Sequence, residues 1–181
     1  KIKFFGKIMS KILITGGNGF IGKALCENLK SSNYKLNISS RRNFPNRVNG
    51  LKVYNIREIN KNTNWSNALK GVSCVIHCAA KTHVLNNLKK NSLSSFRKVN
   101  VEGTINLAKQ AVNSGVKRFV FLSSIKVNGE RTDKSSMFKH YDIPKPEDAY
   151  GVSKWEAEQG LWQLSRQTGL QVVIIRAPLV Y

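Results

Sequence analysis

The chain has 181 residues, of which 41% are hydrophobic and 22% are charged. This length predicts a single domain, at residues 10–181, that buries a substantial core. The longest apolar runs, such as residues 172–175, are far too short to cross a bilayer. Three cysteines cannot all pair within one chain, so no disulfide framework is expected. The sequence therefore predicts a reducing, cytoplasmic setting.

Basic residues outnumber acidic residues by 30 to 10, and the formal net charge is +20. Such an excess is typical of proteins that bind nucleic acid, an anionic membrane surface or an anionic small molecule. The basic residues are scattered, without a block of five or six and without interleaved aromatic residues. This scatter disfavours nucleic-acid binding and leaves an anionic cofactor or substrate as the better match.

Residues 1–9 form an N-terminal extension in this interpretation. They contain no apolar segment and no small-residue cleavage site of the kind that a secretory signal carries. Met9 stands immediately before the first strand-like run, where a chain start is expected.

Apolar, strand-like runs alternate with amphipathic, helix-like stretches along the rest of the chain. The expected elements, in chain order, are strand 11–15, helix 20–31, strands 35–39, 51–54 and 72–77, helix 94–114, strand 118–122, helix 150–168 and strand 171–175. Asp148 is the candidate N-cap of the last helix, and Gly169 is its stop. Nearly continuous apolar strands that alternate with helices predict an α/β fold, a doubly wound parallel sheet with helices on both faces.

The segment after the first strand is rich in glycine. Gly16, Gly19 and Gly22 stand at a spacing of three, between a predicted buried strand and a predicted helix. In this context the first glycine permits a tight turn, the second admits a pyrophosphate and the third allows the helix to pack on the strand. Free N–H groups and the helix dipole favour a phosphate there, so the turn predicts dinucleotide binding. A purely structural turn is the alternative.

The end of the second strand is where selection between NAD and NADP is expected. An acidic residue there binds the ribose 2′-hydroxyl of NAD. Here Ser40 and Arg41 follow the strand, and no carboxylate does. A guanidinium and a hydroxyl suit a 2′-phosphate, so NADP is favoured over NAD, although exposed arginines are ordinary in a basic protein.

Tyr150 and Lys154 lie four residues apart, on one face of the last predicted helix. A nearby ammonium is expected to lower the pKa of the phenol, which could then exchange a proton with an alcohol or carbonyl. Ser123 and Ser124 end the fifth strand, at the edge of the sheet where ligands bind. This set predicts hydride transfer at a carbinol carbon, with the hydride carried by the cofactor. A zinc site at Cys74, His77 and Cys78 is disfavoured, since no fourth ligand is evident.

These residues together resemble the extended short-chain dehydrogenase/reductase family, the nucleotide-sugar epimerases and dehydratases. The matching segments are spread over residues 10–181 in the order of the family, namely 15–22, 77–80, 100–104, 122–124, 150–154 and 176–181. The resemblance implies a Rossmann-like NAD(P)-binding domain and a UDP-sugar substrate.

The resemblance also implies roles for individual residues. The catalytic residues are Ser124, Tyr150 and Lys154. The cofactor contacts, besides Tyr150 and Lys154, are Gly16, Gly19, Phe20, Ile21, Gly22, Ser40, Arg41, Asn55, Ile56, Ala79, Ala80, Asn100, Ser123, Ala177 and Pro178. Asn55 departs from the family, which usually has aspartate against the adenine.

A second departure concerns the reaction. Dehydratases of the family carry an Asp–Glu pair directly after the catalytic hydroxyl, where this chain has Ile125 and Lys126. Dehydration is therefore disfavoured. Residues 119–130 and 150–158 look most like the branch linked to UDP-N-acetylquinovosamine, whose members reduce a UDP-4-keto-6-deoxy-N-acetylhexosamine in O-antigen or capsule synthesis. The alternatives are a UDP-glucose or UDP-N-acetylglucosamine 4-epimerase and a non-catalytic dinucleotide- or RNA-binding derivative of the fold.

The family has a smaller substrate domain after the sixth strand, and this chain stops at Tyr181. A C-terminally truncated fragment is therefore expected, which binds the cofactor weakly and turns over substrate poorly. Apolar surface is expected on the late strands and on Trp155 or Trp162. The resemblance implies a homodimer in the full-length form.

Overall fold

The computed structural model describes residues 10–30, 32, 34–41, 51–82, 92–132 and 136–180. The predicted N-terminal extension, residues 1–9, and the last residue, Tyr181, lie outside the described residues. The described strands form one six-stranded sheet in the order β3-β2-β1-β4-β5-β6, and every neighbouring pair is parallel. The strands are β1 (Lys11–Thr15), β2 (Lys35–Ser40), β3 (Leu51–Asn55), β4 (Cys74–His77), β5 (Arg118–Ser124) and β6 (Gln171–Ala177).

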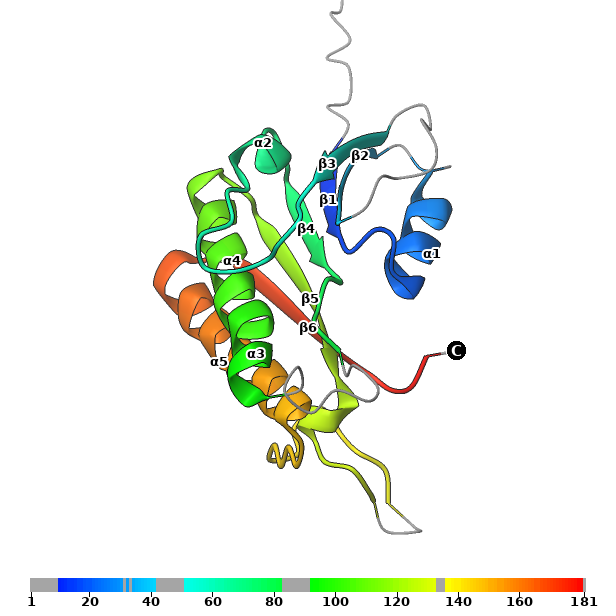
Figure 1. Ribbon diagram of the computed structural model, residues 1–181, viewed down its shortest axis with the longest axis vertical. Helices are drawn as coiled ribbons and strands as arrows, with labels where there is room; N and C mark the ends of the chain where they lie inside the picture. Colours follow the sequence, from blue (N-terminus) through cyan, green and yellow to red (C-terminus); the bar gives the residue numbers. More distant parts are fainter. Residues whose placement is uncertain are drawn as a thin grey trace, which may run out of the picture.

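Helices cover both faces of this sheet (Figure 1). One face carries α1 (Phe20–Leu29), and the other carries α4 (Thr104–Asn113) and α5 (Ala149–Thr168). The strand order is that of the doubly wound Rossmann fold, in which the order reverses between β1 and β4. The predicted fold class is confirmed.

The central strand β1 is apolar almost throughout because both of its faces are buried. In β1, Ile12 and Ile14 pack with Cys26 of α1, whereas Leu13 joins the larger core beneath α4 and α5. Leu107 of α4 and Leu161 of α5 pack in that larger core and have no exposed surface. The two cores hold the carboxyl ends of the strands in fixed positions.

The helix predicted at residues 94–114 is not one regular α-helix. It begins as α3 (Leu93–Phe96), continues as a π-helix, η2 (Arg97–Gly103), and ends as α4. Gly103 packs so closely on Ile59 that a Cβ there would lie 2.5 Å from the Ile59 side chain. Two further short helices, α2 (Ser66–Leu69) and the 3₁₀ turn η3 (Ile125–Val127), were not predicted, because one turn is too short to show a period.

The last strand, β6, has one covered and one uncovered face within the described part of the chain. Val172 and Ile174 pack against the larger core, while Val173 and Ile175 are exposed. Trp162 is also exposed, whereas Trp155 is half-buried. The expectation of apolar surface on the late strands is therefore confirmed for these residues.

Among the helices of the described ranges, none combines the length and the apolar composition needed to cross a bilayer.

Candidate active site

The glycine-rich turn lies at the point where the strand order reverses. Gly16 follows β1 in a left-handed conformation (φ 70°), which a residue with a side chain rarely adopts. A Cβ on Gly16 would lie 2.9 Å from the backbone nitrogen of Ala79, which follows β4. A Cβ on Gly22 would lie only 2.2 Å from the carbonyl oxygen of Gly16. The first and third glycines are thus required by packing within the protein, as the motif predicts.

The second glycine of the motif is open toward solvent. Gly19 is the N-cap of α1 and offers no side chain to the free N–H groups of the first turn, which also contains no acidic residue. Phe20 is 68% exposed beside it. A pyrophosphate fits a helix start of this kind, because N–H donors and the positive end of the helix dipole meet there.

The ends of β2 and β3 lie side by side, since Ser40 pairs with Asn55 in the parallel register. The Ser40 hydroxyl is buried and accepts a hydrogen bond from the Asn18 amide at 2.7 Å. Arg41 and Asn55 are exposed, and Ile56 is half-buried against the larger core. This edge therefore presents a guanidinium and an amide, as predicted, at the side of the glycine turn that is remote from β5 and β6.

His77, at the end of β4, is a buried neutral group. Its ring nitrogens are hydrogen-bonded to the hydroxyls of Thr15 at 2.6 Å and Thr104 at 3.0 Å. Burial, together with the nearby Lys154 ammonium, lowers the pKa of His77 to about 3. The Thr15 hydroxyl also accepts from the Ala79 backbone N–H at 3.2 Å. His77 therefore fixes the backbone that leads into Ala79 and Ala80.

This buried histidine predicts a loss of stability at acidic pH. The unfolded chain binds a proton at His77 with a pKa near 6.5, whereas the folded chain does so only at about 3. The free energy of unfolding is thus expected to fall as the pH drops from 6.5 toward 3. Urea unfolding across this range should show a smaller slope for His77→Gln than for the wild type. The exposed His140→Gln is the control, and an equal slope in all three proteins would contradict the prediction.

Asn100, in the π-helix, clamps the segment that follows β4. Its amide accepts from the Lys81 N–H at 2.8 Å, donates to the Lys81 carbonyl at 3.0 Å, and donates to the Ser153 hydroxyl at 3.0 Å. Asn100 is 1% exposed. Asn100, which the family resemblance implies as a cofactor contact, therefore anchors backbone beside the site.

Ser124 and Tyr150 meet at the carboxyl end of β5. Their side chains are hydrogen-bonded to each other, and the Ser124 hydroxyl also accepts from the Lys126 backbone N–H at 3.3 Å. Tyr150 stands in the first turn of α5, which Asp148 caps through a 2.6 Å bond from the Gly151 N–H. The cap predicted at Asp148 is confirmed, and the two predicted hydroxyls lie together.

The electrostatics of Tyr150 differ from the prediction. Burial raises the pKa of the phenol, and the Asp148 carboxylate raises it further. The charge that lowers this pKa is Lys126, which binds Asp148 at 2.7 Å, and the Ser124 hydrogen bond adds to it. The expected lowering of the pKa by Lys154 is therefore wrong for this structure, because that ammonium lies against the ring of Phe121 instead, 3.9 Å from its centroid.

Lys154 is 1% exposed, and burial lowers its pKa to about 7. An ammonium has three N–H donors, and a ribose hydroxyl of a dinucleotide bound along the glycine turn is an acceptor that suits them. The open face of Gly19 and the free N–H groups beside it show that the residues present fit NAD(P).

Two charged residues at the site escaped the sequence interpretation. Glu158 is fully buried on α5 and accepts hydrogen bonds from Ser123 and from Arg176 of β6. An acidic residue on a helix is usually solvated, so only its spacing of four from Lys154 could have revealed it. Ala177 and Pro178 follow Arg176 directly, and the β5–β6 register places Ala177 opposite Ser124.

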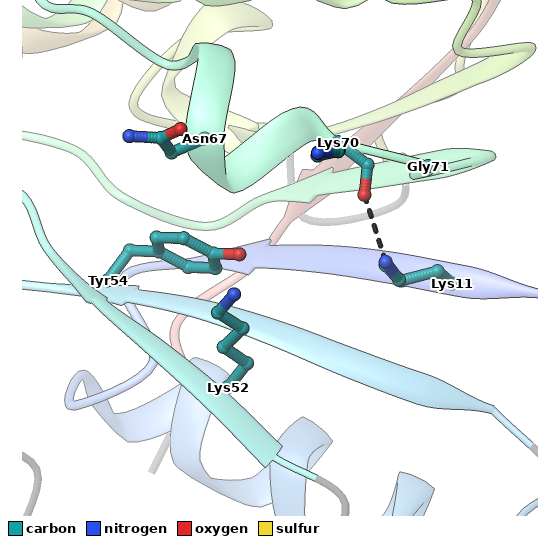
Figure 2. Close-up of a pocket in the computed structure, with 6 residues that line it drawn as sticks. All are labelled: Lys11, Lys52, Tyr54, Asn67, Lys70 and Gly71. Atoms are coloured by element: carbon teal, nitrogen blue, oxygen red, sulfur yellow. Dashed lines mark hydrogen bonds between the residues drawn. The ribbon is translucent and has the colours of Figure 1, made fainter.

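A separate surface hollow of about 640 Å³ lies between β3 and α2 (Figure 2). It is lined by Lys11, Lys52, Tyr54, Asn67, Lys70 and Gly71. None of the predicted site residues lines it.

Several known proteins are similar to this chain in sequence and in fold. A UDP-glucose 4-epimerase of Vibrio cholerae is 44% identical over 97% of this chain and 53% of its own length. A Bacillus cereus UDP-glucuronic acid 4-epimerase in complex with NAD is 27% identical, with a TM-score of 0.79 over 94% of this chain and 57% of that one. An Agrobacterium tumefaciens short-chain dehydrogenase/reductase superfamily protein with bound NAD gives a TM-score of 0.80 at 27% identity, over 92% and 48%.

The chain spans about half the length of the curated relatives that it matches. The profile of the NAD dependent epimerase/dehydratase family matches residues 12–181, which is nearly the whole chain. The chain belongs to the NAD dependent epimerase/dehydratase family.

Proposed function

We propose that the protein that carries this chain is an NAD(P)-dependent enzyme that acts at C4 of a UDP-sugar. The observation that carries the proposal is the hydrogen-bonded pair Ser124 and Tyr150, with buried Lys154 one helical turn farther on. The pair stands at the carboxyl ends of the strands, where ligands of open parallel sheets bind.

The residues have distinct tasks in the proposed reaction. Bound NAD(P) would supply the acceptor and donor of the hydride at C4. Tyr150 takes the proton of the C4 hydroxyl and gives it back to the C4 carbonyl oxygen. Ser124 holds that oxygen by a hydrogen bond, and Lys154 binds the ribose. Lys126 is the charge that lowers the pKa of the phenol. Asn100 keeps the backbone at Lys81 in place beside them.

4-Epimerisation is the reaction that we propose first. The 44% identity to the Vibrio cholerae UDP-glucose 4-epimerase supports it. The residues after the catalytic hydroxyl, Ile125 and Lys126, lack the carboxylates that an elimination of water needs. Incubation of the whole protein with UDP-glucose or UDP-N-acetylglucosamine is expected to yield the C4 epimer without net consumption of cofactor. A protein with bound NAD that forms no epimer from either sugar would refute the assignment.

Reduction of a UDP-4-keto-6-deoxy-N-acetylhexosamine is the second candidate. It is favoured by the end of β2, where Ser40 and Arg41 stand without a carboxylate and so suit NADP. A reductase must exchange its cofactor at each turnover, and it would consume one NADPH per sugar. Stoichiometric loss of NADPH absorbance with a 4-keto sugar therefore distinguishes it from the epimerase.

Replacement of Arg41 is expected to separate the two cofactors. A hydrogen bond from a guanidinium to a phosphate contributes about 1.5–3 kcal/mol. Arg41→Ala is therefore expected to weaken NADP binding by about tenfold or more and NAD binding by much less. Calorimetric titration with both cofactors measures this, with the exposed Arg57→Ala at the start of the next loop as the control. An equal effect on both cofactors would remove the argument for NADP.

Assembly and location belong to the same proposal. We expect a cytoplasmic homodimer that forms through the outer surfaces of α4 and α5, as the family resemblance implies. A molecular mass measured by light scattering tests the dimer directly.

A further inference from the structure

Glu158 has a buried carboxylate that joins three elements of the site. Its Oε1 accepts a 2.5 Å hydrogen bond from the Ser123 hydroxyl. Arg176 donates to the same carboxylate from Nε and, at 2.7 Å, from one terminal nitrogen. A carboxylate with no exposed surface requires such partners, since an unpaired buried charge is strongly destabilising. The carboxylate thus fastens α5 to the carboxyl ends of β5 and β6.

The strand ends held in this way are the ones that carry site residues. Ser123 precedes Ser124, and Arg176 precedes Ala177. In the parallel register, Ser123 lies opposite Arg176. The other terminal nitrogen of Arg176 donates to the Asn128 side chain at 3.1 Å, which adds the segment after η3 to the same assembly.

Glu158 also stands one helical turn after Lys154 and is the main group that supports its charge. Burial alone disfavours the ammonium, and the Glu158 carboxylate raises the pKa of Lys154 against that effect. The other groups around Lys154 supply little negative charge at neutral pH. The Cys78 thiol has its pKa raised to about 11, His77 is neutral, and the phenol of Tyr150, one turn earlier, has a raised pKa.

We propose that Glu158 is a positioning residue, whose carboxylate supplies the negative charge that keeps the Lys154 ammonium protonated near neutral pH and holds Ser124 and Ala177 at the strand ends. The inference rests on the proposed function, in which charged Lys154 binds the cofactor ribose. Glu158 itself does not contact the reacting atoms in this proposal.

The test follows the titration of Lys154 by NMR. The whole protein is labelled with ¹³C-lysine, and the Lys154 signal is identified by its loss in Lys154→Met. Glu158→Gln is expected to move the midpoint at least about one pH unit lower, the size of effect of a close opposite charge. Arg176→Gln is expected to move it higher, because the Glu158 charge is no longer neutralised. An unchanged or higher midpoint in Glu158→Gln overturns the proposal.

Ser123→Ala is the matched control for loosened packing. It removes one hydrogen bond to Glu158 and keeps the charge, so its midpoint should equal that of the wild type. Water admitted by looser packing would instead raise the midpoint in all three variants. If Glu158→Gln does not fold, the other two variants still test the proposal. Equal Lys154 midpoints in Arg176→Gln and Ser123→Ala would overturn it.

The same variants separate this inference from the proposed function. If both hold, activity of Glu158→Gln at neutral pH falls and recovers at lower pH, in step with the Lys154 midpoint. The Lys154 midpoint could also shift as expected while neither the wild type nor any variant acts on UDP-sugars. In that case the electrostatic task of Glu158 stands and the proposed function fails.

Discussion

Tyr150→Phe is expected to lower kcat of the whole protein on its UDP-sugar by about 10²- to 10⁴-fold, the usual range for losing a general acid–base group. The substitution removes one oxygen, and with it both the proton that moves at C4 and the hydrogen bond with Ser124. Packing of the ring on Phe96, at 6.0 Å between centroids, is retained. The loss should therefore appear in kcat, with NAD(P) affinity within about threefold of the wild type.

The control for Tyr150→Phe is Tyr141→Phe, which makes the same change at an exposed position. It should leave kcat unchanged. Full activity of Tyr150→Phe would remove the proton transfer assigned to this phenol, and with it the oxidoreductase mechanism.

Gly22→Ala is expected to destabilise the fold by about 3 kcal/mol, the upper end of the usual range for overpacked sites. The added Cβ would lie 2.2 Å from the Gly16 carbonyl oxygen and 2.8 Å from the Gly16 carbonyl carbon, both rigid backbone atoms. Alanine in a helix is worth about 1 kcal/mol over glycine, so the overlap must exceed that gain. Chemical denaturation measures the net effect, and the exposed Lys23→Ala in the same helix is the control.

Gly19→Ala offers a contrast within the same turn. Among the residues that the structure describes, its Cβ would meet only the Gly16 carbonyl oxygen, at 3.2 Å, so the free energy of unfolding should change by less than about 1 kcal/mol. The same Cβ would occupy the space through which a pyrophosphate approaches, and NAD(P) affinity should fall by about tenfold or more. Equal effects of the two substitutions on stability, or unchanged affinity in Gly19→Ala, would contradict the assignment of the turn.

The sheet could be predicted from the sequence because its signal is local. A strand buried on both faces is apolar along its whole length, as in residues 12–14, and every predicted strand is present. The predicted ends of the strands were less accurate. Arg176 and Ala177 extend β6 beyond the predicted end at residue 175 because they pair with Ser123 and Ser124, and a partner more than 50 residues away leaves no local pattern.

The members of the candidate site could be proposed from the sequence, and their electrostatics could not. Tyr150, Lys154 and Ser124 were predicted from spacing and position, and the structure brings the hydroxyls of Ser124 and Tyr150 together. The pKa of the phenol depends instead on burial, on Asp148 and on Lys126, which no spacing rule connects. The proposed role of Glu158 could not be predicted for the same reason, because it depends on partners on β5 and β6.

The π-helix at residues 97–103 has a consequence for how this protein tolerates insertions and deletions. A π-helix turn holds about one residue more than an α-helix turn, so it resets the angular phase between Asn100 and the core residues of α4 that follow. Loss of a single codon in this stretch would turn Asn100 about 100° away from Lys81, or Leu107 out of the core. The number of residues between these two side chains is therefore under tighter constraint than most of the residues themselves.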